Sequence, residues 1–403
     1  MFSFPLLCSC SDSEDFYLNL KPLSQEEKLQ DFQYLYDAVK ENYPMLEMNK
    51  IKYNVDWLDR KDKYIKHIKG TKNDEDFAKA IETILNDLND YKTGILFDID
   101  KSNEIPKPSQ ELFNNVIKRD TVMKRYRGSK PGDSKKSSTP SSSPMYEKNI
   151  ADTTVMEDII PNEMAYIRIP KALDTVSRND DEKNLHNYLK NIINYKTLIV
   201  DLRGSSSIDM SYLCDFLFSS IIDRSYCSNF YFVFKNSKLT HELLESTYDS
   251  NTMPLNIDKL AEEGLPLLPP EVLKDFSYFK KYPINIAPNS ESINLKGKIY
   301  IFTDPKTANA ASIFASFAKY SHLATLVGSA SPGQELLSPI IYDSLPNSGY
   351  VFRLHCAITI NQDGSWFDNK GVEPDILVSE YGFITDNLKD DFYIKKILEL
   401  EKR

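Results

Sequence analysis

Residues 295–334 read LKGKIYIFTDPKTANAASIFASFAKYSHLATLVGSASPGQ, and this stretch decides the fold. Lys298–Thr303 is rich in β-branched and aromatic residues and is followed by Asp304-Pro305, which predicts a strand that ends in a turn. The apolar residues after the turn recur at helical spacing, namely Ala310, Ile313, Phe314, Phe317 and Ala318. We therefore expect a helix that begins near Ala308 and leads into another strand.

Asn309 lies where this strand, turn and helix present a side chain to a substrate. A residue at the start of a helix is surrounded by unpaired backbone N–H groups and lies at the positive end of the helix dipole. Both features favour a developing oxyanion. The geometry expected here is that of a catalytic elbow.

An ordinary structural role also explains Asn309. Asparagine is among the best helix N-caps, because its side-chain oxygen accepts a hydrogen bond from an N–H two or three residues further on. Its amide has no ionisable hydroxyl and is a poor nucleophile toward a peptide carbonyl. We expect Asn309 to act as a cap and not as a nucleophile.

Four further stretches carry recognisable motifs in a fixed order. They are NDLNDYKTGIL at 86–96, AYIRIP at 165–170, LIVDLRGSSS at 198–207 and DGSWFDNKGVEPDILV at 363–378. Together with the elbow, they resemble the motifs of the tail-specific, or C-terminal processing, serine peptidases and their tricorn relatives. The resemblance covers most of residues 25–380 and implies a ClpP/crotonase-like spiral core.

The departures from that family concern its catalytic side chains. The resemblance implies a serine at Asn309, an acidic residue at Ser312 and a histidine base at Lys92. It also implies a glycine-rich oxyanion loop at 205–207 and, in the tail-specific branch, a lysine at Gln334. None of these side chains is present. We therefore expect an impaired catalytic site.

Backbone N–H groups beside the elbow are the candidates for binding an oxyanion or a peptide. We assign this role to Gly204, Ser205 and Ala310. Gly204 is the one glycine of the loop that remains, and the serines after it carry a Cβ that resists positive φ. A serine-rich loop between a buried strand and a helix is otherwise ordinary turn and cap chemistry.

Lys92 has two interpretations. Burial can depress the pKa of a lysine enough for it to act as a general base, and Ser312 is the hydroxyl that such a base could activate. Ser312 lies about 4.5 Å further along the helix axis than Asn309, however, which misaligns it with the first turn. In the structural interpretation Lys92 forms an ion pair with Asp90 or with Asp368, which occupies the position of the acid that supports the histidine in the tricorn-like branch.

The chain divides into four parts by composition and pattern. We expect a truncated signal or lipoprotein segment at 1–23, a small helical domain at 24–100, a flexible linker at 101–160 and the peptidase-like core at 161–403. Ser24 and Glu27 form a capping box that starts the helical domain. The tract at 128–144, GSKPGDSKKSSTPSSSP, is too polar to order itself.

Strands and helices alternate through the core. Strands are expected at 165–169, 197–202 and 230–234, and helices at 181–193, 211–222 and 389–400. The segment 239–288 is interpreted as an insertion, partly helical. Alternating βα units imply an α/β fold with a mainly parallel sheet covered by helices.

Composition narrows the partners and the compartment. The net charge of −10 and the pI near 5.2 argue against a nucleic-acid surface, and no apolar run is long enough for a membrane helix. No dinucleotide, phosphate-binding or zinc motif occurs, so no cofactor is implied. Leu7-Cys8-Ser9-Cys10 resembles a bacterial lipoprotein box, which predicts an extracytoplasmic protein that a lipidated Cys10 attaches to the membrane.

Three functions follow from these patterns. The first is a peptidase-like protein that binds peptides or unfolded polypeptide in its former active site without cleaving them. The second is an active peptidase with Lys92 as base and Ser312 as nucleophile. The third is a structural surface lipoprotein. A fold alone does not choose between them.

Overall fold

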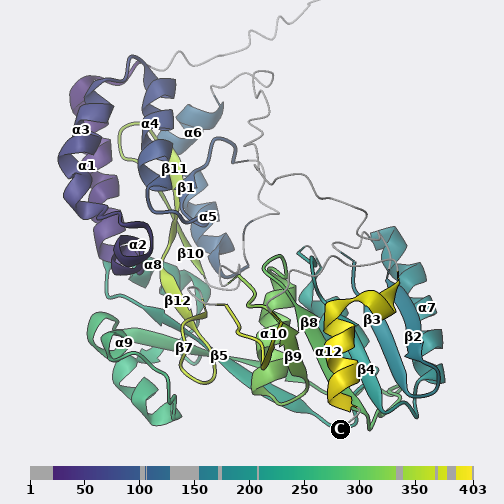
Figure 1. Ribbon diagram of the computed structural model, residues 1–403. Helices are drawn as coiled ribbons and strands as arrows, with labels where there is room; N and C mark the ends of the chain where they lie inside the picture. Colours follow the sequence, from purple (N-terminus) through teal and green to yellow (C-terminus); the bar gives the residue numbers. More distant parts are fainter. Residues whose placement is uncertain are drawn as a thin grey trace, which may run out of the picture.

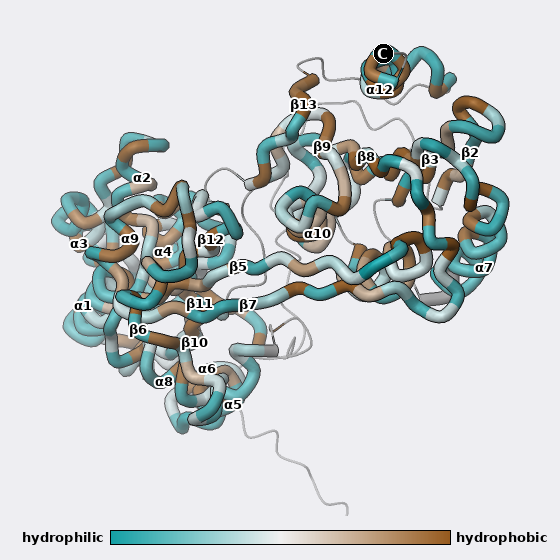
Figure 2. The backbone as a smooth tube through the Cα atoms, turned by 90° about the horizontal axis from the view of Figure 1, so that it is seen from below, coloured by the Kyte–Doolittle hydropathy of each residue, from teal (hydrophilic) through white to brown (hydrophobic). Residues whose placement is uncertain are grey.

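The computed structural model describes residues 21–99, 105, 107–127, 154–170, 175–206, 208–332, 339–367, 371–378 and 387–401. These residues form two lobes, an N-terminal lobe and a core lobe (Figure 1). The long strands β5 (Tyr226–Phe234) and β7 (Tyr278–Ile286) run between the lobes as an antiparallel ribbon (Figure 2).

The core lobe is built on a six-stranded sheet with the order β13-β9-β8-β4-β3-β2. Its strands are β2 (Val155–Ile160), β3 (Met164–Arg168), β4 (Thr197–Asp201), β8 (Lys298–Thr303), β9 (Thr325–Gly328) and β13 (Ile376–Leu377). Neighbouring strands are parallel except β2, which pairs antiparallel with β3. The predicted α/β class with a mainly parallel sheet is confirmed.

The strands of this sheet are apolar on both faces, and helices cover both of them. On one face α10 (Ala310–Tyr320), the π-helix at Tyr212–Phe218 and α7 (Thr175–Asn191) belong to one hydrophobic core with the strands. On the other face α12 (Phe392–Glu401) packs through Tyr393, Ile394 and Ile397. The helices predicted at 181–193, 211–222 and 389–400 are present, although the second is π-helical in place of α-helical.

The N-terminal lobe begins with four helices. They are α1 (Gln25–Asn42), α2 (Leu46–Tyr53), α3 (Lys61–Lys69) and α4 (Asp74–Asn86). Ser24 caps α1 in the predicted capping box, because its side chain accepts from the N–H of Glu27 and the Glu27 carboxylate accepts from the N–H of Ser24.

These helices do not have a hydrophobic core of their own. Phe32, Leu35 and Ile81 share one buried cluster with Val233 and Ile358, which follow much later in the chain. The expected boundary at residue 100 is therefore not a boundary of the core. A group of four short helices buries too little apolar surface alone, and strands from the C-terminal half supply the rest.

Two small sheets join the helices to the ribbon. One has the order β1-β11-β10 and comprises β1 (Gly94–Ile95), β10 (Ile340–Ser344) and β11 (Val351–His355). The other has the order β12-β5-β7-β6 and adds β6 (Leu255–Asn256) and β12 (Ala357–Ile360).

Two expectations about connecting segments need correction. The segment 239–288 contains helices α8 (Lys238–Thr247) and α9 (Pro270–Asp275), as expected, but it also contributes β7. The expected linker contains α5 (Gln110–Ile117), α6 (Asp120–Arg127) and β2, because Leu112, Phe113 and Val116 give α5 an apolar face that packs on β10. The Ser/Pro/Lys tract at 128–144 lies outside the described residues.

Arg203 connects the end of β4 to the C-terminal helix. Its Nη2 lies 2.6 Å from Oδ2 of Asp201 and 2.9 Å from Oδ2 of Asp391, and all three side chains are buried. The guanidinium also stacks on Tyr393, with its carbon 4.4 Å from the ring centroid. Asp391 in turn accepts from the N–H groups of Tyr393 and Ile394, so it caps α12.

We predict that Arg203→Met destabilises the core lobe by about 3–5 kcal/mol, because it leaves two buried carboxylates without their cation. Arg178→Met is the matched control, since its pairs with Glu182 and Asp209 are partly exposed and should contribute under about 1 kcal/mol. Urea unfolding followed by circular dichroism measures both. Equal losses in the two variants would contradict the role given to Arg203.

Candidate functional site

The turn after β8 is held against the loop after β4. Thr307 donates through Oγ1 to the carbonyl of Leu202 at 3.1 Å and to the carboxylate of Asp304 at 3.0 Å. The N–H of Ala308 donates to the carbonyl of Ser205 at 3.0 Å. The start of α10 is thus fixed at the carboxyl edge of the parallel sheet, where α/β proteins bind their ligands.

Asn309 has a strained backbone at this turn. Its φ is 52° and its ψ is −130°, a combination that residues with a Cβ rarely adopt. Such strain persists only where the surrounding structure enforces it, and it is concentrated at functional sites. The predicted strand, turn and helix are present, and α10 begins directly after Asn309 at Ala310.

The capping role predicted for the Asn309 side chain is wrong. No side-chain hydrogen bond caps α10. Nδ2 of Asn309 instead donates to the carbonyl of Ser206 at 2.7 Å. The physical reason lies in the backbone, because a cap needs the extended φ and ψ that bring its oxygen toward the first turn, and Asn309 has positive φ.

The candidate oxyanion donors differ in their availability. Gly204, with φ of 76°, donates its N–H to Asp304 Oδ1 at 3.1 Å, and Ser205 donates its N–H to the carbonyl of Leu202 at 3.0 Å. Both groups are already used within the protein, so neither fits the role expected of it. Ala310 holds the first position of α10, where an N–H has no acceptor within the helix.

Ser312 is enclosed. Its side chain is fully buried, and its Oγ lies 2.6 Å from Oγ of Ser331 and 3.2 Å from the carbonyl of Pro332. A nucleophile needs both a free hydroxyl and access to the substrate. The position of Ser312 therefore disfavours the predicted pair with Lys92.

Lys92 lies in the N-terminal lobe, directly before β1, and is 1% exposed. Its backbone N–H donates to Oδ1 of Asp90 at 2.9 Å. Oδ2 of the same carboxylate lies 2.9 Å from Nδ1 of His355, at the end of β11. Asp90 thus has a histidine as its close partner, which the sequence analysis did not identify. Asp368, Gln334 and Ser207 lie outside the described residues.

The partnership of Asp90 and His355 depends on strand pairing across 265 residues. Gly94 of β1 pairs with Arg353 of β11, and Thr93 accepts the N–H of His355 at 3.1 Å. No local pattern signals this pairing, because β1 has only two residues. The local sequence places Asp90 two residues before Lys92 in the motif at 86–96, but it does not indicate His355 as a partner.

The charge state of Asp90 follows from its partners. Burial would raise the pKa of its carboxyl, but the His355 ring and then the Lys92 ammonium outweigh burial and lower that pKa to about 2. Asp90 is therefore an anion that is stabilised inside the N-terminal lobe. It holds the segment with Lys92 against β11.

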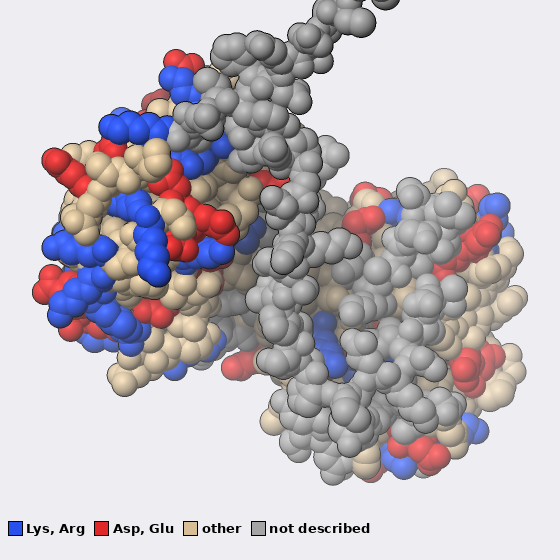
Figure 3. All heavy atoms as spheres, turned by 90° about the horizontal axis from the view of Figure 1, so that it is seen from above, with Lys and Arg blue, Asp and Glu red and all other residues tan. Residues whose placement is uncertain are grey.

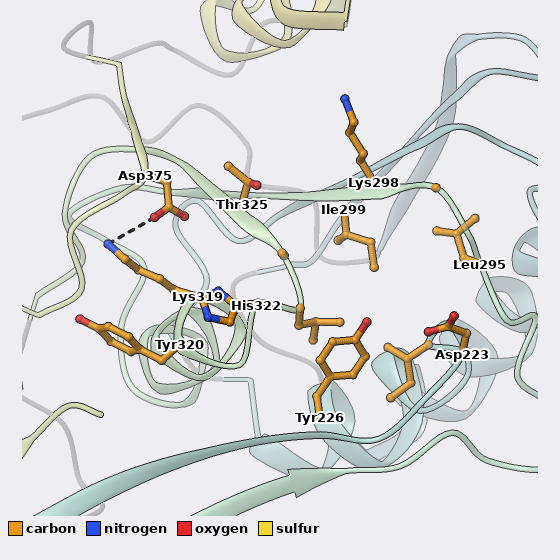
Figure 4. A pocket seen from close by; sticks show the side chains of 14 residues that line it. Asp223, Tyr226, Leu295, Lys298, Ile299, Lys319, Tyr320, His322, Thr325 and Asp375 are labelled. Carbon is orange, nitrogen blue, oxygen red and sulfur yellow. Dashed lines mark ion pairs between the residues drawn. The ribbon is translucent and has the colours of Figure 1, made fainter. Parts of the chain in front are cut away.

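A separate pocket of about 580 Å³ opens at the other edge of the parallel sheet. It lies beside Lys298 and Thr325, at the starts of β8 and β9. At one side of it Lys319 pairs with Asp375, with Nζ 3.4 Å from Oδ1 (Figure 4). Asn309 follows the opposite end of β8, so this pocket includes none of the predicted site residues.

Two structural features bear on cofactors and membranes. Among the described residues, no three His, Cys, Asp or Glu side chains are grouped as a metal ion would require. Among the same residues, no helix has both the length and the apolar character needed to span a bilayer.

We predict an acid-dependent loss of stability from Asp90. Its folded pKa of about 2 lies below the ordinary value of 3.8, so its contribution is present above about pH 4 and is lost as the pH falls through about 2. A shift of this size corresponds to about 2 kcal/mol. Urea unfolding between pH 2 and 5 should show a shallower pH dependence in Asp90→Asn. An unchanged slope in that variant would argue against the pairing.

We predict that Asn309→Gly is more stable than Asn309→Ala by about 1 kcal/mol. Both variants lose the hydrogen bond to Ser206, but glycine adopts positive φ without strain. Thermal unfolding of the two proteins measures the difference. Equal melting temperatures would indicate that the backbone at residue 309 is not strained.

A known family and several solved structures are similar to this chain. The family model described as Peptidase family S41 matches residues 163–378. A peptidase candidate from Parabacteroides merdae shares the fold with a TM-score of 0.53 at 17% identity, over 93% of this chain and 96% of that one. Mature CPAF complexed with lactacystin is similar with a TM-score of 0.52 at 13% identity, over 94% and 98% of the two chains.

No curated protein matches the sequence. The family match covers the parallel sheet, the loop after β4 and the elbow at Asn309, and it extends over more than half of the 403 residues. The protein belongs to peptidase family S41.

Proposed function

We propose that this protein binds peptides or polypeptide termini at the elbow of its S41 fold without hydrolysing them. The observation that carries the proposal is Asn309, which keeps a strained elbow backbone but has an amide in place of a nucleophile. Membership of a peptidase family supports peptides or proteins as ligands.

The loss of catalysis follows from the chemistry of the site. The amide of Asn309 cannot form the covalent intermediate that a serine forms, and its Nδ2 is bonded to the carbonyl of Ser206. Ser312 is the nearest hydroxyl on the same helix, but it is buried and engaged with Ser331. Neither side chain supports the alternative of an active peptidase.

The support for binding comes from the start of α10. The first N–H groups of an α-helix and its dipole attract a carbonyl oxygen or a carboxylate, whether or not a reaction follows. Ala310 presents such a group next to the elbow. We also propose that the protein acts outside the cytoplasm, in line with the lipoprotein-like sequence around Cys10.

We predict that the protein binds peptides from a mixed library with micromolar affinity and cleaves none of them. Asn309→Phe should weaken binding at least tenfold, because the ring fills the space in front of α10. Asn294→Phe is the matched control, since Asn294 has a similar φ of 51° and is exposed elsewhere on the surface. Fluorescence anisotropy measures affinity, and mass spectrometry detects cleavage.

Two outcomes would overturn this function. Cleavage that disappears in Ser312→Ala would establish a rearranged serine site. A protein that remains folded but binds no peptide at high micromolar concentration would leave a structural role in its place.

A further inference from the structure

The strongest local charge in the described chain lies around α3. Residues 60–72, RKDKYIKHIKGTK, contain six Lys or Arg side chains and one Asp, so they carry a charge of +5 in a protein whose net charge is −10. Such an asymmetry points to an anionic partner for one surface, against the trend of the whole molecule.

The fold turns this charge outward. Tyr64 and Ile68 of α3 are buried in the hydrophobic core of the N-terminal lobe. Lys63, Lys66 and Lys69 occupy the opposite side of the helix and are exposed, as is Lys72 after it. None of these four lysines, here called the α3 basic face, forms an ion pair within the part of the chain that the structure describes.

Basic and acidic side chains are mixed elsewhere on this lobe (Figure 3). Asp62 is the one acidic residue within α3. The acidic first turn of α4 is partly neutralised, because Asp74 pairs with Arg125 at 2.9 Å and Glu75 with Lys79 at 2.5 Å. Asp76 accepts the backbone N–H of Lys72 at 3.3 Å, but the ammonium groups of the α3 basic face form no ion pair with it or with another carboxylate among the described residues.

The chain enters the structure beside this face. The N–H of Leu23 donates to Asp74 Oδ1 at 3.0 Å, and Nε2 of Gln25 donates to the carbonyl of Lys69 at 3.3 Å. Lys28 reaches Oγ1 of Thr71 at 3.2 Å. The first described residues therefore lie next to the α3 basic face.

We propose that the α3 basic face docks on the anionic phospholipid headgroups of a membrane, next to the point where the N-terminal segment is attached. A single apolar or lipid anchor holds a protein only weakly, and stable attachment needs a second signal such as a basic surface. Exposed lysines supply that signal through their attraction to anionic lipid. Gln25, near the start of the described chain, contacts Lys69 of α3, so an anchor in the preceding segment and the basic face would act on the same side of the lobe.

The test uses the full chain without lipidation and vesicles of phosphatidylglycerol and phosphatidylcholine. Sedimentation should show binding that weakens as salt is raised, and little binding to pure phosphatidylcholine. Changing Lys63, Lys66, Lys69 and Lys72 to Gln should reduce binding at least tenfold. A matched variant changes the same number of exposed lysines elsewhere, namely Lys190, Lys238, Lys274 and Lys306, and should bind like the unchanged protein.

Three outcomes would overturn the proposal. One is equal binding by the two lysine variants, and another is no binding to anionic vesicles at low salt. The third is polyphosphate binding to the α3 basic face as tightly as vesicles do at equal phosphate concentration, which would make this face a general polyanion site. Unchanged circular dichroism of both variants shows that a loss of binding is not a loss of fold.

Discussion

The buried ion pairs of Arg203 with Asp201 and Asp391 are the interaction on which the candidate site depends. They fix the end of β4 to the start of α12, and the loop that carries Ser205 and its neighbours leaves directly from Arg203. Removing one partner of a buried ion pair is strongly destabilising, because it leaves the other charge buried and uncompensated. The ion pairs therefore hold the loop at a defined position at the carboxyl edge of the sheet.

That loop in turn constrains the elbow. The carbonyl of Ser205 accepts the N–H of Ala308, and the carbonyl of Ser206 accepts from the side chain of Asn309. Together these contacts keep a strained φ and ψ at residue 309, whose side chain is an amide. A scaffold of this kind can bind a peptide oxygen at the start of α10 without completing a reaction. This geometry is the basis of the proposed peptide-binding function.

The two lobes are one structural unit as far as packing is concerned. Strand β5 contributes Phe230 to the core of one lobe and Val233 to the core of the other. The N-terminal helices complete their core only with strands from the C-terminal half. One of these strands, β11, carries His355, which pairs with Asp90. The segment that carries Lys92 is consequently positioned by residues from the opposite end of the chain.

The sequence by itself determined the alternation of strands and helices, the turn at Asn309, and the presence of Asn309 and Lys92 where the family resemblance implies a serine and a histidine. These features depend on local periodicity, turn chemistry and the identity of single residues, all of which can be read along the chain. Only the tertiary structure decided that Asn309 bonds to Ser206, that Ser312 is enclosed and that Asp90 pairs with His355. Each of these contacts joins residues on different elements, and the hydrophobic pattern of one element does not specify which partner it meets or which way a side chain turns there.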